Sequence, residues 1–179
     1  MSMEETRKKW QGNPMVKPRI EKVTVNMAVG KSGEILERAT RVLEQLTGQQ
    51  PCKRSAKMTI RDFGIRKGEP IAGIVTLRKE KAKEFLKKAF YAVDNKISKE
   101  KFDNYGNFSF GIREHIEMPG TKYVPELGIH GMDVCVTFCR PGYRVKKRRR
   151  AKSHVGSKHT LAPEETMLFI KDEFGVETV

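Results

Sequence analysis

The chain has 179 residues, and its 36 lysines and arginines outnumber its 22 aspartates and glutamates, which gives a formal net charge of +14. This length fits one domain rather than two independent cores, and the positive charge favours a partner that carries phosphates or another anionic surface. The sequence shows no signal-like leader and no apolar run near the ~20 residues of a membrane helix, and its three cysteines have no scaffold-like spacing. We therefore expect a soluble, intracellular protein with free thiols and no membrane contact.

The first eighteen residues are polar and basic, and Gly12, Pro14 and Pro18 interrupt any long element. We expect residues 1–18 to be a flexible basic lead-in. Regular structure should begin directly afterwards, so that residues 19–179 make a single domain.

The first element of that domain is predicted to be a strand, because residues 23–29 alternate between apolar side chains and small or polar ones. A turn follows in which Ser32 is placed to cap the next helix, and apolar residues then recur at helical spacing up to Gly48. Glycine readily adopts the left-handed conformation that ends many helices, so Gly48 is a natural stop. We expect this helix to cover one face of the strand.

A strongly basic segment follows the helix. Between Lys53 and Lys67 six cations stand against one acid, Asp62, and single apolar residues are interleaved among them. Cations neutralise phosphates and aromatic rings stack on bases, so we interpret residues 53–68 as a loop that becomes ordered on RNA. The alternative is a solvated surface hairpin, since most charge runs are simply hydrated.

The remaining elements are predicted in the same way. Residues 113–131 form a long segment rich in glycine and proline, and a loop of this length inside a compact domain is more often functional than idle. Mostly antiparallel strands with about three amphipathic helices predict an α+β fold, a two-layer sandwich in which the helices cover one face of the sheet. Periodicity places the strands at residues 71–78, 107–112 and 133–139, and the helices at residues 82–93 and 163–175.

The face of the sheet that the helices leave open is predicted to carry small and polar side chains. Such groups let a nucleic-acid backbone approach closely and offer hydrogen-bond partners to phosphates and 2′-hydroxyls. The alternative is an ordinary solvent-facing sheet. The residues concerned are Thr24, Asn26, Thr76, Arg78, Ser109, Gly111 and Thr137.

A second basic block runs from Arg140 to Lys152 with eight lysines and arginines and no acid. Like charges repel, so we expect this block to stay extended until it is bound, with none of its residues buried. Its partner is left open among RNA, DNA and acidic protein. Because it connects a strand to the last helix, we treat residues 144–160 as an insertion anchored at both ends.

The spacing of Cys135, Cys139, His154 and His159 invites comparison with a zinc finger. Residues four apart in a strand lie ~13 Å from each other, which is too far for one tetrahedral metal ion. We therefore expect no metal site.

Catalytic motifs are equally unsupported. The sequence contains no phosphate-cradling loop with its lysine, no dinucleotide fingerprint and no nucleophile elbow. His115 and His130 stand alone in the sequence, and we interpret them as surface or RNA-stacking residues rather than catalysts. The segment from Gly128 to Gly131 favours a tight turn over the GxxG clamp of an RNA-binding module. We expect neither an enzyme nor a cofactor.

Several blocks of the sequence resemble one known family, the L5 family of large-subunit ribosomal proteins, which bind 5S rRNA. The blocks are RIEKVTVNMAVG, GIRKGEPIAGIVTLR, NFSFGIREHIEMPG, GMDVCVTFCRPGYR and APEETMLFIKDEFG, in the same order as in the family. The resemblance covers the chain from about Arg19 onward. The basic insertion VKKRRRAKSHVGSKHT and the short lead-in are similar to the archaeal and eukaryotic branch rather than the bacterial one.

This resemblance implies a structural, non-enzymatic protein in the central protuberance of the large ribosomal subunit, in the cytoplasm. Its implied partners are 5S rRNA, the larger rRNA, peptidyl-site tRNA and neighbouring ribosomal proteins, including one of the small subunit. Residues 53–68 would reach toward the tRNA, and residues 113–131 would lie near the small subunit. The rival readings, an RNA-processing enzyme and a DNA-binding regulator, would need a cluster of catalytic side chains or an exposed recognition helix.

The resemblance and the predicted sheet face together single out three groups of residues. Three rRNA-contacting positions follow from the family, at Asn26, Gln49 and Thr76, and the sheet face adds Lys22, Thr24 and Arg78. The tRNA-contacting group is Lys53, Lys57, Arg61, Phe63 and Arg66. Other RNA contacts are expected from Arg144, Lys146, Lys147, Arg148, Arg149 and Arg150.

Overall fold

The structure, a computed structural model, describes residues 3–179. Its central element is a five-stranded sheet in the order β2, β3, β1, β6, β5, and every neighbouring pair is antiparallel. The four predicted strands are confirmed, and β2 is an addition within the basic segment. The sheet strands are β1 (Arg19–Ala28), β2 (Cys52–Ser55), β3 (Pro70–Leu77), β5 (Phe108–Ile112) and β6 (Met132–Cys139), and a parallel pair joins β4 (Lys96–Ile97) to β7 (Glu177–Thr178).

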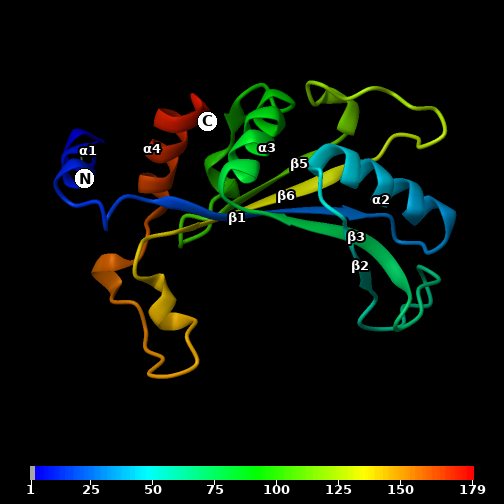
Figure 1. The fold of residues 1–179 in the computed structure, drawn as a ribbon, viewed down its shortest axis with the longest axis horizontal. Helices are drawn as coiled ribbons and strands as arrows, with labels where there is room; N and C mark the ends of the chain where they lie inside the picture. The colour runs from blue at the N-terminus through cyan, green and yellow to red at the C-terminus, as the bar shows by residue number, and fades with distance from the viewer. Residues whose placement is uncertain (1–2) are drawn as a thin grey trace.

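The helices lie on one side of this sheet, which confirms the predicted two-layer α+β fold. Figure 1 shows α2, α3 and α4 above the sheet, while two long connections project below it. The described helices are α1 (Met3–Gly12), α2 (Glu34–Thr47), α3 (Lys79–Tyr91) and α4 (Pro163–Phe174). Short 3₁₀ turns are η1 (Lys99–Lys101), η2 (His115–Glu117), η3 (Tyr143–Lys146) and η4 (Ser157–His159).

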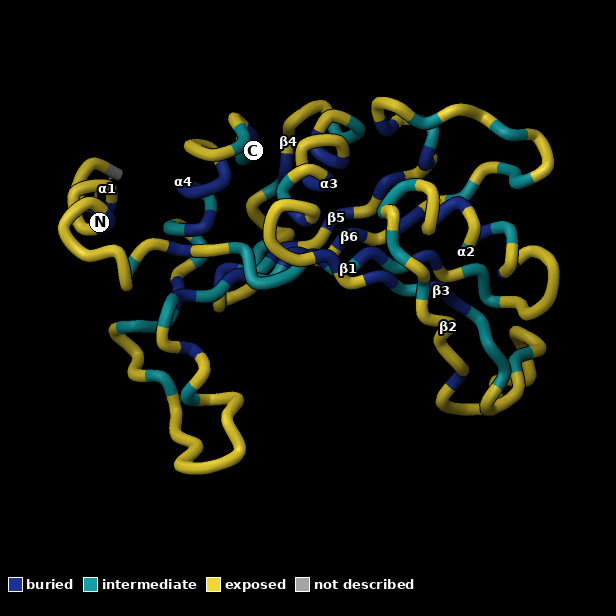
Figure 2. Tube along the Cα trace, viewed as in Figure 1, coloured by how far each residue is buried: buried dark blue, intermediate teal, exposed yellow. Residues whose placement is uncertain are grey.

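The core lies between the sheet and the helices. Alternate residues of β1, namely Val23, Val25 and Met27, are completely buried against the helical layer. Phe90 of α3 stacks on two residues of β5, with centroid distances of 6.2 Å to Phe108 and 5.7 Å to Phe110. Figure 2 shows this pattern as buried segments along the sheet and exposed segments in the two lower projections. Because successive side chains of a strand point to opposite faces, the second face of the sheet takes no part in this core and is free for a partner.

The lead-in differs from the expectation of a flexible segment, apart from residues 1 and 2, which lie outside the described residues. Helix α1 forms there, and Trp10 is only 9% exposed because its ring packs edge-on against Phe169 of α4, with 6.4 Å between centroids. Arg7 adds an ion pair to Asp172 at 2.5 Å. The acids in the first turn and the lysine in the last turn also suit the helix dipole. Tertiary packing on α4 thus gives this short segment the stability that an isolated helix would lack.

The start of α2 also differs from the prediction. Ser32 does not cap the helix, because its hydroxyl donates a hydrogen bond to the carboxylate of Glu69 instead. Gly33 occupies the cap position with φ 94° and ψ −151°, a conformation that glycine adopts at low cost. The predicted stop at Gly48 is confirmed, since its φ is 61° and its N–H donates to the carbonyl of Glu44 at 2.8 Å.

Candidate nucleic-acid interface

The open face of the sheet carries a band of small and polar side chains that crosses four strands. In the central row, Thr24 of β1 lies between Thr76 of β3 and Cys135 of β6, and Ser109 of β5 follows Cys135. The next row places Asn26 between Ile74 and Asp133, and Lys22 lies opposite Thr137. Exposed or half-buried side chains alternate here with the buried core positions. The structure thus brings Lys22, Thr24, Asn26 and Thr76 together, as predicted.

Two predicted rRNA contacts lie at the margins of this band. Arg78 follows β3, and its guanidinium donates a hydrogen bond to the carbonyl of Glu21 at 3.4 Å. Gln49 is half-buried in the bend between α2 and β2, one residue beyond the helix stop. It therefore lies close to β2, which is the edge strand opposite β5. The row that contains Asn26 and Ile74 ends at this edge, at Cys52 of β2.

The basic segment between β2 and β3 forms a closed hairpin-like loop. Ile60 and Ile65 pair across its tip, and Ala56 and Gly68 are joined by a 2.9 Å hydrogen bond at its base. The carboxylate of Glu69 accepts bonds from the hydroxyl of Ser32 and the amide of Arg66, and the Ser32 bond is the main cause that lowers the pKa of Glu69. These contacts hold the loop below the sheet (Figure 1).

The tip of this loop combines exposed apolar side chains with unpaired cations. Phe63 is 71% exposed and Met58 is 69% exposed, although both are large and apolar. Lys53 forms a 3.8 Å ion pair with Glu37 of α2. Within residues 3–179, the other cations of the predicted tRNA-binding group, Lys57, Arg61 and Arg66, have no ion-pair partner. The loop is therefore free to offer charge and an aromatic ring to a polyanion.

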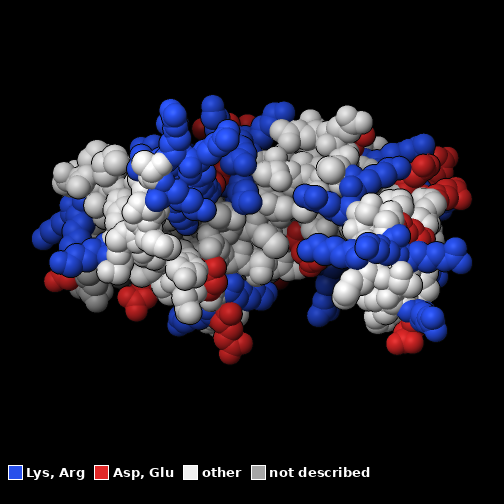
Figure 3. All heavy atoms as spheres, turned by 90° about the horizontal axis from the view of Figure 1, so that it is seen from below, with Lys and Arg blue, Asp and Glu red and all other residues white. Residues whose placement is uncertain are grey.

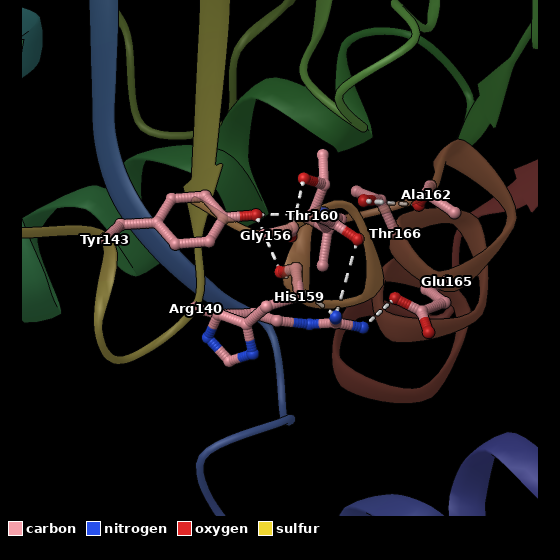
Figure 4. Close-up of polar contacts among 9 residues, drawn as sticks. Arg140, Tyr143, Gly156, His159, Thr160, Ala162, Glu165 and Thr166 are labelled. Atoms are coloured by element: carbon pink, nitrogen blue, oxygen red, sulfur yellow. Dashed lines mark hydrogen bonds and ion pairs between the residues drawn. The ribbon is translucent and has the colours of Figure 1, made fainter. Parts of the chain in front are cut away.

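The basic block 140–152 contradicts the expectation of an extended segment with no buried residues. Arg140, at its start, is only 3% exposed, and Tyr143 is buried as well. The guanidinium of Arg140 forms an ion pair with Glu165 of α4 and donates to the carbonyls of His159 and Thr160 (Figure 4). The buried cation is stabilised because the two carbonyls and the carboxylate replace water at Nη1 and Nη2, whereas its Nε is buried without a partner among the described residues.

Tyr143 adds to the buried contacts that Arg140 makes with residues 159–165. Its hydroxyl accepts a hydrogen bond from the amide of Leu161 at 2.8 Å and donates to the carbonyl of His159 at 3.3 Å (Figure 4). Burial raises the pKa of this tyrosine. The imidazole of His159 in turn bonds the carbonyl of Pro141 at 2.8 Å. The residues just before the insertion are thus tied to those at its end, and its basic residues form a defined arch between these points.

The cations of the insertion are exposed on this arch. Lys146 lies 4.5 Å from the centroid of the Tyr143 ring, Lys147 pairs with Glu21 of β1, and Arg148 donates to the carbonyl of Ala151 at 2.8 Å. Arg144, Arg149 and Arg150 are also exposed. Figure 3, which views the molecule from below, shows lysines and arginines gathered over both projections, with a mostly uncharged surface between them.

Comparisons with known proteins show the family to which the chain belongs. The family model "Ribosomal protein L5" matches residues 13–66, and the model of the C-terminus of the same ribosomal family matches residues 70–169. The chain belongs to the ribosomal protein L5 family. Two archaeal relatives, each a "Large ribosomal subunit protein uL5", share 54% identity: the Sulfurisphaera tokodaii protein over 93% of this chain and 95% of its own length, and the Aeropyrum pernix protein over 95% and 89%. The protein of the same name from Methanococcus vannielii is 51% identical over 95% of this chain and 96% of its own length.

Sequence reasoning about this L5-family chain was wrong in treating two histidines as isolated. His115 is buried, and its ring lies 6.5 Å from that of His130. The amide of His130 donates to Nδ1 of His115 at 3.3 Å, and the His130 ring bonds the carbonyl of Leu127 at 2.9 Å. Burial lowers the pKa of His115. The pair therefore closes the base of the 113–131 loop.

Some residues of the interface were missed by sequence reasoning. Asp133 and Cys135 share the open face with Thr24 and Asn26, and burial followed by the charge of Asp133 raises the pKa of Cys135. Tyr105 lies at the edge of this face in an exposed turn. Among residues 3–179, no three His, Cys, Asp or Glu side chains gather as a metal site would require, and no helix there is long and apolar enough to cross a membrane.

Proposed function

We propose that this L5-family chain binds 5S rRNA through the open face of its sheet, in the central protuberance of the large ribosomal subunit. As a member of a ribosomal protein family it is a structural component of the cytoplasmic ribosome and not an enzyme. The family membership supports rRNA and other ribosomal proteins as partners. The finer assignment to 5S rRNA rests on the family resemblance and on the character of the sheet face.

One observation carries the proposal: an uncovered polar sheet face lies between two cationic projections on the same side of the molecule. Small side chains such as Thr24 and Thr76 let an RNA backbone approach the strands, and Asn26 provides both a donor and an acceptor. Lysines and arginines of the two projections then flank the backbone and neutralise its phosphates (Figure 3). Such a surface recognises the shape and backbone of folded RNA rather than a base sequence.

The two exposed loops suit further ribosomal contacts. The 53–68 loop, which carries Lys57, Arg61 and Phe63, is proposed to contact peptidyl-site tRNA. The 113–131 loop, which exposes Tyr123 and Ile129, is proposed to face a protein of the small subunit. The insertion is proposed to contact 5S rRNA, with the larger rRNA and a neighbouring ribosomal protein as the alternative partners.

The proposal is tested by measuring binding of the purified protein to 5S rRNA and to an unrelated structured RNA across a salt series. We expect 5S binding to persist at salt concentrations that abolish binding of the control RNA, because directed hydrogen bonds are screened less than phosphate attraction. The Asn26→Ala/Thr76→Ala variant should lose that margin. If both RNAs dissociate together and the variant matches the wild type, net charge alone explains the binding.

The assignment of 5S rRNA to the sheet face and of tRNA to the 53–68 loop has its own test. The Lys57→Ala/Arg61→Ala variant removes two cations from the 53–68 loop but none from the sheet face. We expect it to bind 5S rRNA nearly as well as the wild type, while ribosomes that contain it retain peptidyl-site tRNA less well. An equal loss of both activities would contradict the assignment of separate surfaces.

A further inference from the structure

We propose that a cleft between the open sheet face and the insertion binds one unpaired nucleotide of RNA, with its base stacked on Tyr105 and its phosphates beside Lys22 and Lys146. We call this site the Tyr105 cleft. The inference rests on the proposed RNA-binding function and deepens it, because it names a pocket that takes a single nucleotide rather than a surface that follows a backbone.

The cleft has the size and position that such a ligand requires. Its volume is about 720 Å³, which is within the range of small-ligand sites. Lys22 and Thr137, which face each other across β1 and β6, line the cleft from the sheet. Tyr143, Lys146 and His154 line it from the insertion. The cleft therefore opens on the side of the molecule where the proposed RNA lies.

Tyr105 is held by a rigid turn although its own ring is free. One carboxylate oxygen of Asp103 accepts bonds from the amides of Tyr105 at 2.8 Å and Asn107 at 2.7 Å, and the other accepts from the Asn107 side chain. Asn107 also accepts a bond from the amide of Phe138, which ties the turn to β6. Gly106 is buried against α4, where an added Cβ would lie 2.3 Å from Oγ1 of Thr166. A fixed turn that exposes 66% of a tyrosine provides a stacking platform whose backbone has little entropy left to lose.

The opposite wall is equally fixed. The hydroxyl of Tyr143 bonds Leu161 and His159, and Arg140 anchors the same segment to Glu165. This wall cannot collapse onto Tyr105 without breaking those buried contacts, so the space between the two walls is preformed.

The charges of the cleft favour a phosphate-bearing ligand. Three lysines line it against one acid, Glu21, and that acid is already paired with Lys147. Lys22 and Lys146 have no carboxylate partner in the described part of the chain. An exposed aromatic ring in a cleft that two such cations also line matches a base with its flanking phosphates, which is how proteins hold splayed-out nucleotides of RNA. A duplex offers no free base face to stack on, so the ligand is an unpaired nucleotide.

The test compares Tyr105→Ala with two variants in binding to large-subunit rRNA, including 5S rRNA. Tyr105→Phe keeps the aromatic ring, and Tyr91→Ala removes a tyrosine of α3 that is equally exposed, at 64%, but lies on the helical layer. Base stacking of about 1–3 kcal/mol predicts that Tyr105→Ala weakens binding about 5- to 150-fold. Tyr105→Phe and Tyr91→Ala should bind within twofold of the wild type. Ultraviolet crosslinking of the wild-type complex, read by mass spectrometry, should join the 103–107 turn to an unpaired nucleotide.

Four results separate the alternatives. If the wild type binds rRNA but Tyr105→Ala binds equally well and no crosslink involves the turn, the cleft does not hold a base while the proposed function stands. If Lys22→Ala and Lys146→Ala weaken binding and Tyr105→Ala does not, the cleft holds backbone phosphate only and the inference is wrong. If free adenosine or guanosine monophosphate binds the protein at micromolar concentration, the site serves a soluble nucleotide instead. If the wild type binds no large-subunit rRNA, the proposed function itself fails, and this inference with it.

Discussion

Replacement of Arg140 by methionine should destabilise the protein strongly, although this arginine belongs to a basic segment that resembles an exposed arm. The variant keeps a similar volume but removes the guanidinium. It leaves the Glu165 carboxylate, whose side chain is 17% exposed, and two backbone carbonyls without their donor. Breaking a buried ion pair from one side typically costs about 3–5 kcal/mol. Because Glu165 keeps some access to water, we expect the lower end of that range, about 3 kcal/mol, or a fall in Tm of roughly 6–12 °C.

Urea denaturation of two further variants shows whether this cost arises from the buried pair. The Arg140→Met/Glu165→Gln double variant should be more stable than Arg140→Met alone, because it no longer buries an uncompensated carboxylate. Lys147→Met breaks the ion pair to Glu21, in which the lysine side chain is 51% exposed, and should cost at most about 1 kcal/mol. Hydrogen exchange should also speed up for amides near the anchor, such as that of Leu161. A loss below about 1 kcal/mol for Arg140→Met, or no relief in the double variant, would refute the reasoning.

Two further predictions concern the loops beside the interface. Burial lowers the pKa of His115 below its usual value of about 6.5, so the unfolded chain takes up a proton before the folded chain does. The free energy of unfolding should be highest above pH ~6.5 and should fall as the pH drops through that value. Urea titrations at several pH values should show a smaller fall for the His115→Gln variant. Gly106→Ala should cost roughly 2–4 kcal/mol, because it adds a clash with Thr166 to the strain of a positive φ of 72°. Gly128 has a similar φ of 75° but open space around it, so Gly128→Ala should lower the free energy of unfolding by only ~1 kcal/mol in a thermal melt. Equal losses in Gly106→Ala and Gly128→Ala would argue against the clash with Thr166.

Local sequence determined most of the fold. The alternation at Val23, Val25 and Met27 sets which face of β1 is buried, and the helical spacing of apolar residues sets the inner faces of α2, α3 and α4. Both signals are read within one element, because side-chain direction follows directly from the backbone period. The polar character of the open face follows for the same reason, which is why Thr24, Asn26 and Thr76 were found from the sequence.

The tertiary structure alone decided what depends on distant partners. Trp10 and Arg140 stand in basic segments whose composition predicts exposure, yet both are buried because a later element, α4, supplies Phe169 to Trp10 and Glu165 to Arg140. Composition reports the average cost of burying charge, whereas a specific carboxylate and specific carbonyls can offset that cost at one position. The same holds for the Tyr105 cleft, whose walls are 38 residues apart at Tyr105 and Tyr143. The side-chain periodicity of either segment does not predict that the two walls lie close together, because the pairing of β5 with β6 and the packing of α4 bring them there.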